Sequence, residues 1–315
     1  MTDRPVLVAS ARASILRGSK SFAAASHLFD RRTRERVWLL YAWCRRCDDL
    51  VDGQDHGGML GARQGIEDRL VTVRERTAQA LAGHRTGDPA FDALGLVARE
   101  TGLTPAMTEA VIAGFALDAI DWQPRDEADL MRYCWHVAGA VGVMMAVVMG
   151  VPPDDEDTLD RACDLGLAFQ LANIARDLRE DDAGGRCYVP AEWLAEADIP
   201  PGEQMKPHYR PALATIAARL CAIARTHESS ARVGAARLAL RQRWAILAAA
   251  GIYGGIARAV VRRGTKAWDA RVFVPRGRKV GLIGLAALEA AMPVARGHHR
   301  IAAGRRFTRR DLIHI

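Results

Sequence analysis

The sequence predicts an all-α fold, and three observations support this prediction. Apolar residues recur at three- and four-residue spacing along almost the whole chain, with no sustained alternation of apolar and polar residues. Half of the 315 residues are hydrophobic and only 6% are aromatic, and the abundant alanine and leucine favour helices over strands. None of the expected breaks is long or polar enough for a linker between domains. We therefore expect residues 1–315 to form a single helical domain.

Local signals place several elements along this domain. One apolar helical face is traced by Val37, Leu40, Cys44, Cys47 and Val51. Thr104 and Pro105 have the residue types that begin a helix. Residues 137–151 are uncharged but too short for the roughly 20 residues that span a bilayer, and their glycines (Gly139, Gly142 and Gly150) indicate close packing in a buried core helix. Residues 274–281, rich in proline and glycine, are expected to be a break.

The positive charge of the chain lies near its end. The sequence has 44 Lys and Arg against 37 Asp and Glu, and residues 262–315 alone contribute 13 basic and three acidic residues, a net charge of +10. We expect a basic tail over about 296–315, and its arginines are Arg296, Arg300, Arg305, Arg306, Arg309 and Arg310. Without an interleaved aromatic stacking platform this tail does not predict nucleic-acid binding; it favours contact with anionic lipid, and a solvated terminus is the alternative.

The beginning of the chain predicts where the protein resides. Residues 1–18 contain three arginines and no continuous apolar stretch, which is not the pattern of a secretory signal. We expect a cytoplasmic protein that is at most peripheral at the inner face of the membrane.

Two acidic segments carry the chemistry. Asp48 and Asp52 are four residues apart and therefore share one helical face, with Arg45 one turn earlier. Asp177 and Asp181 repeat this spacing, and the stripe is extended toward the N-terminus by Asn173 and Gln170. Carboxylate and amide oxygens are hard ligands that suit Mg²⁺ or Mn²⁺. Two such stripes across a bundle cavity would hold a diphosphate through bound metals; the competing interpretation is a solvated acidic face.

Basic and hydroxyl residues could complement the acids. The run Ser19-Lys20-Ser21-Phe22 offers hydroxyls and a cation for phosphate oxygens, and Arg186 follows the second segment in a glycine-rich turn. Each of these is more often an ordinary surface residue, so their assignment depends on the acid pairs.

The chain resembles the squalene/phytoene synthase family in four blocks. They read Gly18-Ser-Lys-Ser-Phe22, Leu40-Tyr-Ala-Trp-Cys-Arg-Arg-Cys-Asp-Asp-Leu-Val-Asp52, Tyr133-Cys-Trp-His-Val-Ala-Gly-Ala-Val-Gly142 and Leu165-Gly-Leu-Ala-Phe-Gln-Leu-Ala-Asn-Ile-Ala-Arg-Asp-Leu-Arg-Glu-Asp181, the last continuing to Gly185-Arg-Cys-Tyr-Val-Pro190. Their order and spacing match the family over about residues 15–265. The resemblance implies an isoprenoid synthase helical bundle with a central active-site cavity.

The resemblance also implies the site residues. Metal ligands and catalytic acids would be Asp48, Asp52, Asn173, Asp177 and Asp181, of which the four aspartates are the catalytic groups. Substrate or diphosphate would be bound by Ser19, Lys20, Ser21, Phe22, Tyr41, Arg45, Gln170, Arg176, Arg186 and Tyr253. Aromatic faces for carbocations would come from Phe22, Tyr41, Tyr133 and Phe169.

The implied reaction joins two geranylgeranyl diphosphates head to head, through a cyclopropyl intermediate, to give phytoene and two diphosphates in carotenoid biosynthesis. It implies a divalent metal cluster of Mg²⁺ or Mn²⁺, no NADPH, and hand-over of the product to a phytoene desaturase. Relatives with shorter products tend to have a bulky residue where this chain has Ser26. A synthase of the squalene or dehydrosqualene type that uses farnesyl diphosphate, and a catalytically silent helical assembly factor, are the alternatives.

Overall fold

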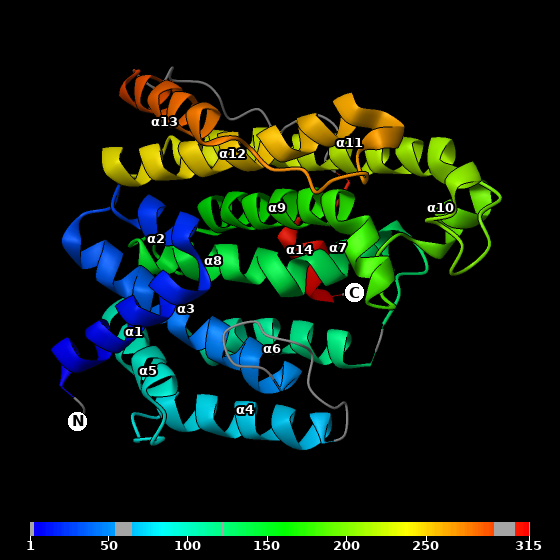
Figure 1. The fold of residues 1–315 in the computed structure, drawn as a ribbon. Helices are drawn as coiled ribbons and strands as arrows, with labels where there is room; N and C mark the ends of the chain where they lie inside the picture. The colour runs from blue at the N-terminus through cyan, green and yellow to red at the C-terminus, as the bar shows by residue number, and fades with distance from the viewer. Residues whose placement is uncertain (1–2, 54–64, 121, 293–305, 315) are drawn as a thin grey trace. The chain divides into compact units, whose positions relative to one another are not determined.

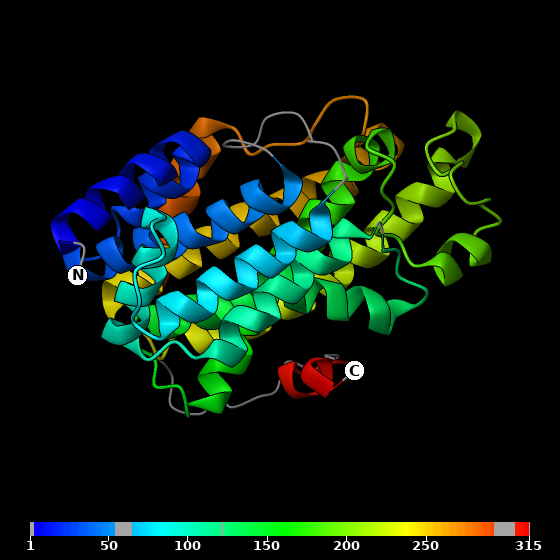
Figure 2. The same ribbon diagram turned by 90° about the horizontal axis from the view of Figure 1, so that it is seen from below.

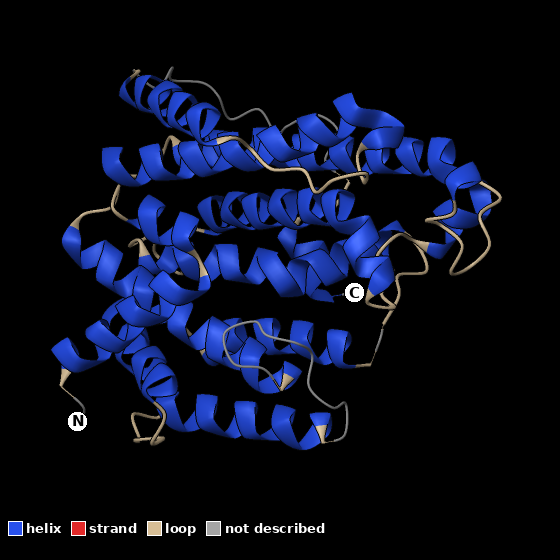
Figure 3. Ribbon diagram, in the orientation of Figure 1, coloured by secondary structure: helices blue, strands red, loops and turns tan. Residues whose placement is uncertain are grey.

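The computed structural model describes the chain except for residues 1–2, 54–64, 121, 293–305 and 315, and except for the side chains at positions 20, 21, 24, 52 and 314. Every regular element in this described part is a helix (Figure 3), which confirms the all-α prediction. The chain forms two compact units, one comprising Met1–Ile120 with Val143–Leu159 and the other Asp121–Gly142 with Asp160–Ile315. The single domain expected from the sequence stays a prediction.

The helices follow one another as Figure 1 labels them. The first unit contains α1 (Arg4–Gly18), α2 (Lys20–Ser26), α3 (Arg31–Asp52), α4 (Ile66–Leu81), α5 (Pro89–Thr101) and α6 (Pro105–Ala119). The second contains α7 (Glu127–Cys134), the π-helical turn η1 (Trp135–Gly139), α10 (Ala191–Glu196), the 3₁₀ turn η2 (Pro207–Tyr209), α11 (Arg210–Ala235), α12 (Leu240–Arg263), the 3₁₀ turn η3 (Gly264–Lys266), α13 (Arg276–Ala291) and α14 (Arg309–His314). Residues of both units belong to α8 (Ala140–Val148) and α9 (Glu156–Ala183).

Helix α3 is the long central helix of the first unit. It begins after Asp30, whose carboxylate accepts the Thr33 N–H at 3.0 Å, and it ends at Gly53, whose φ of 63° suits glycine. The helix packs against α1, α5 and α4, and α4 lies beside α5 and α6 (Figure 2). The predicted start at Thr104 and Pro105 is confirmed as the N-terminus of α6, although the Thr104 hydroxyl makes no capping hydrogen bond.

Glycines allow η1 and the start of α8 to approach α9 in the second unit. A Cβ added at Gly142 would lie 2.4 Å from the Ala162 carbonyl oxygen, and one added at Gly166 would lie 2.2 Å from that of Ala138. Such distances are too short for any side chain, so backbone contact requires glycine at both positions. The predicted close packing is confirmed at Gly142 but is wrong for Gly150, which faces open space at a φ of 98°.

In the part of the chain that the structure describes, two helical stretches would be long and apolar enough to cross a membrane. They are residues Glu127–Val148 and Leu240–Lys266, and 61% and 56% of their most apolar windows are buried inside the protein. Burial of this extent is typical of core helices. It agrees with the expected core helix at residues 137–151.

The C-terminal part corrects one prediction and partly describes the tail. The expected break at residues 274–281 is wrong beyond Pro275, because α13 begins at Arg276. Of the tail arginines, Arg296, Arg300 and Arg305 lie outside the described residues. Arg306 and Arg309 are ion-paired, at 3.1 Å with Glu127 and at 2.8 Å with Asp160. The described end of the tail therefore packs on its own unit through α14.

Candidate active site

The first acidic segment lies near the C-terminal end of α3, where Arg45 pairs with two acids. Its Nη1 is 2.9 Å from Asp48 Oδ2, and its Nη2 contacts Asp49 Oδ1. The Asp49 side chain is only 4% exposed, whereas that of Asp48 is 40% exposed. The Nε of Arg45 is buried and has no hydrogen-bond partner among the described residues. The side chain of Asp52 lies outside those residues. The Arg45 Nε–H is thus a buried donor whose acceptor is not supplied by the described part of the protein.

Aromatic and small residues surround this arginine in the first unit. The ring centroids of Phe22 and Tyr41 are 5.8 Å apart. Burial raises the pKa of Tyr41, although the positive charge of Arg45 acts in the opposite direction. Gly18 has room only for hydrogen there, since a Cβ would lie 2.3 Å from the Tyr41 hydroxyl. The Tyr41 phenol therefore stays protonated near neutral pH.

The motif that follows Gly18 is described only in part. The Ser19 hydroxyl accepts the Phe22 N–H at 3.3 Å and so begins α2. The side chains of Lys20 and Ser21 lie outside the described residues. Ser19 therefore has a structural contact, and the roles of the other two stay predictions.

The second acidic segment lies near the C-terminal end of α9, where Asp177 accepts two arginine forks. Arg176 donates from Nε at 2.7 Å and also from Nη2, and Arg271 donates from Nε and Nη2 at 3.0 and 3.1 Å. These four hydrogen bonds fill the about four acceptor positions of a carboxylate. Burial raises the pKa of Asp177, but the hydrogen bonds and charges of the two arginines outweigh it, so the net shift is downward. Asp177 is therefore an ionised carboxylate.

The other residues of the predicted stripe extend from Asp177 along α9. Asn173, the only asparagine in the chain, lies one turn earlier, and its Oδ1 is buried without a hydrogen-bond partner in the described part of the protein. Gln170 lies a further turn back and is half-buried. Asp181 is half-buried one turn later, and its carbonyl oxygen accepts the Arg186 N–H at 2.8 Å. The turn after α9 thus returns Arg186 to the end of the stripe.

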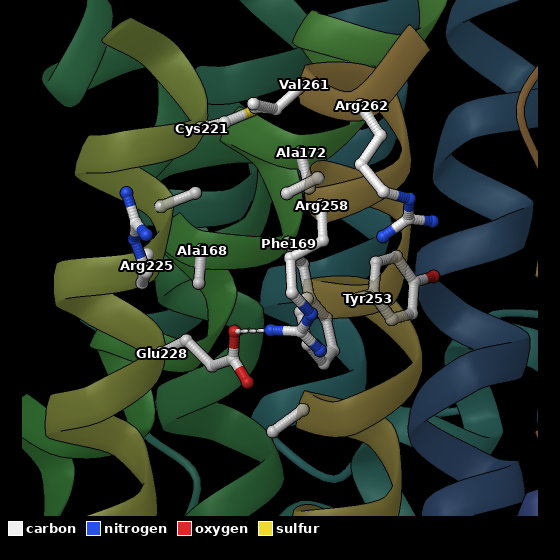
Figure 4. Close-up of a pocket in the computed structure, with 14 residues that line it drawn as sticks. Ala168, Phe169, Ala172, Cys221, Arg225, Glu228, Tyr253, Arg258, Val261 and Arg262 are labelled. Atoms are coloured by element: carbon white, nitrogen blue, oxygen red, sulfur yellow. Dashed lines mark hydrogen bonds and ion pairs between the residues drawn. The ribbon is translucent and has the colours of Figure 1, made fainter. Parts of the chain in front are cut away.

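A cavity of about 320 Å³ lies between α9, α11 and α12 in the second unit. Figure 4 shows Phe169 and Tyr253 at its wall, and their rings stack with centroids 3.9 Å apart. Burial raises the pKa of Tyr253. The remaining lining is mostly alanine, with the arginines Arg225, Arg258 and Arg262 and the acid Glu228, which pairs with Arg258 at 3.3 Å. An apolar wall bounded by cations suits an apolar chain that carries an anionic group.

The donors present suit a hard divalent cation at the second segment. No group of three or more His, Cys, Asp or Glu side chains in the described part of the protein could hold a metal by itself. Asn173 nevertheless offers an unpartnered buried oxygen, and Asp177 an ionised carboxylate. Magnesium commonly takes one or two carboxylates and completes its shell with water and substrate phosphates. The residues therefore fit a metal that arrives with a phosphorylated substrate.

The contacts of one arginine, Arg271, and of one tyrosine, Tyr133, differ from what the sequence suggested. Arg271 is absent from the predicted site because it is 94 residues from Asp177, and no local spacing indicates the contact. Tyr133, expected to offer a ring face to a cavity, is instead stacked between Trp122 and Tyr188, at centroid distances of 5.7 and 4.7 Å. Both of its faces are thereby covered.

Comparisons with known proteins extend this description. The family model for squalene/phytoene synthases matches residues 15–278. A 15-cis-phytoene synthase of Pantoea ananas is 44% identical over 298 residues, which cover 94% of this chain and 96% of the relative. A phytoene synthase of Pseudescherichia vulneris is 44% identical over 283 residues, 89% of this chain and 91% of the relative. The crystal structure of a dehydrosqualene synthase matches with a TM-score of 0.79 and 27% identity, over 90% of this chain and 96% of that one.

Proposed function

Because the chain belongs to the squalene/phytoene synthase family, we propose that it is a 15-cis-phytoene synthase, a prenyltransferase that joins two geranylgeranyl diphosphates head to head. The structural observation that supports the proposal is that each acidic segment contains a buried polar atom without a hydrogen-bond partner among the described residues. Arg45 keeps a free donor at one acidic segment and Asn173 a free acceptor at the other, within the described residues. A donor suits a phosphate oxygen and an acceptor suits a cation. Each segment, taken by itself, thus has a buried group that a part of a metal diphosphate could satisfy.

The acids and cations have distinct roles in this proposal. Asp48, Asp52, Asn173, Asp177 and Asp181 would hold Mg²⁺ or Mn²⁺, which neutralises the charge of the departing diphosphate. Since all acceptor positions of Asp177 are taken by arginines, metal binding requires at least one of them to turn away. A guanidinium released in this way suits a diphosphate oxygen. Arg176 or Arg271 would therefore leave the Asp177 carboxylate when the metal binds and would then contact the diphosphate of the substrate.

The remaining side chains bind and protect the substrate. Diphosphate oxygens are bound by Ser19, Lys20, Ser21, Arg45, Gln170 and Arg186. The ring faces of Phe22, Tyr41, Phe169 and Tyr253 stabilise carbocations and keep water away. The stacked pair of Phe169 and Tyr253 on an apolar cavity supports this role.

Ser26 supports the longer of the two possible substrates. Its side chain is fully buried in α2, where the hydroxyl donates to the Ala23 carbonyl at 2.6 Å and accepts from Trp38 Nε1 at 2.9 Å. Relatives with shorter products tend to have a bulky residue at this position, whereas Ser26 is small. We expect Ser26→Phe to shift the product from C40 toward C30 hydrocarbon, measured by incubation with each diphosphate.

The chemistry of substrate and product indicates the partners. Geranylgeranyl diphosphate is an amphiphile and phytoene an insoluble hydrocarbon, so the enzyme would work at the cytoplasmic face of a membrane. It would pass phytoene there to a desaturase. No NADPH is required, because the product is not reduced.

The proposal is tested by incubating purified protein with geranylgeranyl diphosphate, Mg²⁺ or Mn²⁺ and detergent, without NADPH, and analysing the extracted hydrocarbons. Phytoene should form, and Asp48→Asn and Asp177→Asn should each lower kcat by about 100-fold or more. Glu180→Gln is the matched control, because Glu180 is an exposed acid on α9 and should be dispensable. A product from farnesyl diphosphate alone would replace the proposal with a shorter-chain synthase. Folded protein that is silent with both substrates would indicate an assembly factor.

A further inference from the structure

Helix α13 presents an apolar face to the outside of the second unit. The face consists of Val280, Gly281, Gly284, Leu285, Leu288, Ala291 and Met292, which recur at helical spacing. Val280, Leu285, Leu288 and Met292 are 69%, 63%, 66% and 59% exposed, and Phe273, which precedes the helix, is 72% exposed. A cluster of this kind, in contrast to single exposed apolar residues, marks an interaction surface.

The opposite face of α13 packs against α11 and α12. Ala286 and Ala290 are buried, and Leu282 lies 3.6 Å from the Cβ position of Gly251. Trp244 Nε1 donates to the Ile283 carbonyl at 2.8 Å, and Arg232 pairs with Glu289 at 2.8 Å. These contacts fix the orientation of α13, so that its apolar residues at positions 280, 284, 285 and 288 face outward.

Basic residues lie in the first turn of α13, at the N-terminal end of this surface. Arg276 and Arg278 are exposed, and neither has a hydrogen-bond or ion-pair partner among the described residues. The acids of this region are already paired, Asp269 with Arg210 and Glu289 with Arg232. An exposed apolar helix face beside unpaired cations is the pattern of a helix that lies in the interface of an anionic membrane.

We propose that the α13 face, together with Phe273 and these two cations, is the surface by which the protein binds an anionic lipid bilayer. A second copy of the chain would supply the apolar contact, but the two acids near the same surface of that copy, Asp269 and Glu289, are already paired within the described residues. Lipid phosphates would supply the negative charge. The inference rests on the proposed function, because an enzyme that makes an insoluble hydrocarbon needs a membrane into which to release it.

The test is sedimentation of the full chain with vesicles of phosphatidylglycerol and phosphatidylcholine, in the absence of substrate. Leu285→Ser/Leu288→Ser should weaken the partition coefficient about tenfold or more. Arg276→Gln/Arg278→Gln should weaken it about fivefold per charge, and only on the anionic vesicles. The matched control is Val6→Ser/Val71→Ser, which removes two exposed valines from the first unit and should bind normally. Thermal unfolding shows whether each variant is folded.

A second measurement reports insertion directly. A polarity-sensitive dye on Leu288→Cys should shift to the blue on adding vesicles, whereas the same dye on Val71→Cys should not. Native thiols compete little, because burial raises the pKa of Cys44 and Cys221 to about 12. The proposal would be overturned if all variants bound the vesicles equally, or if the unaltered chain did not bind them. It would also be overturned if light scattering showed a dimer that only the leucine variant abolishes. Phytoene synthesis in detergent is scored separately, so failure of the reaction and failure of the surface are distinguishable.

Discussion

The acidic segments of α3 and α9 contain aspartates at the same spacing but neutralise them differently. On α3, one arginine of the same helix serves Asp48 and Asp49, three and four residues away. On α9, Asp177 receives its neighbour Arg176 and also Arg271, 94 residues along the chain. The first arrangement is local and the second depends on the fold of the C-terminal part. Equal motifs therefore do not imply equal electrostatics.

The two segments also differ in what they leave without a partner. Within the described residues, the acidic segment of α3 has an unpartnered donor at Arg45 Nε, and the acidic segment of α9 has an unpartnered acceptor at Asn173 Oδ1. Each buried orphan costs stability in the free protein, by about 1–3 kcal/mol. Such a cost is expected where a ligand completes the contacts. The stability and the activity of the variants below test whether the two segments differ in this way.

The largest effect on stability is expected from Arg45→Met. Asp49 is almost fully buried, and loss of Arg45 leaves its carboxylate without this partner. We expect the free energy of unfolding to fall by about 3 kcal/mol, measured by urea denaturation. Arg46→Met is the control, because Asp88 retains Arg76 at 3.6 Å when Arg46 is lost. A double variant that adds Asp49→Asn should recover most of the loss; an unchanged Arg45→Met would show that α3 does not depend on local pairing.

The next effect concerns catalysis and separates α9 from α3. Arg271→Gln leaves Asp177 with Arg176, so the fold should tolerate it, but one diphosphate-binding guanidinium is lost. We expect kcat/KM to fall by roughly 10- to 100-fold, measured with geranylgeranyl diphosphate. Arg263→Gln is the matched control, since the hydrogen bond that Arg263 makes within the described residues goes to the Ala270 carbonyl. If both variants were equally active, the Arg271 contact would be structural only.

These two arginines show how far the sequence could predict the site. Helical periodicity predicts which residues share a face on α3 or α9, and so Arg45 was predicted beside Asp48. It contains no information on which distant segment approaches a helix, and so Arg271 was missed. The start of α13 was missed for a related reason. Pro275 and Gly277 suggest a break locally, whereas packing of Leu282 and Ala286 on α12 stabilises helix there.

A smaller effect of opposite sign is expected at Asn173. In Asn173→Leu a buried unpartnered acceptor is replaced by an apolar side chain of similar size, so the free energy of unfolding should rise by about 1 kcal/mol. Phytoene synthesis should nevertheless be lost. Gln204→Leu is the comparison: its Oε1 is also buried without a partner among the described residues, but its Nε2 donates to Asp182, and loss of that hydrogen bond should cancel the gain. A destabilised Asn173→Leu would mean that the amide is satisfied in the free protein.

The smallest effect is the pH dependence of the Asp177 contact. The folded pKa of Asp177 is lowered, against the desolvation that raises it, because the arginines favour the charged carboxylate. Its contribution to stability is therefore complete above the unfolded pKa of about 3.9 and is lost as the pH falls through the lower folded pKa. Because Arg271 is more than half exposed, its share should be below about 1 kcal/mol. Unfolding of the unaltered chain and of Arg271→Gln should thus differ near pH 7 and converge below the folded pKa. A constant difference across this range would place the Arg271 contribution in packing, and α9 would then resemble α3 in needing only its local arginine.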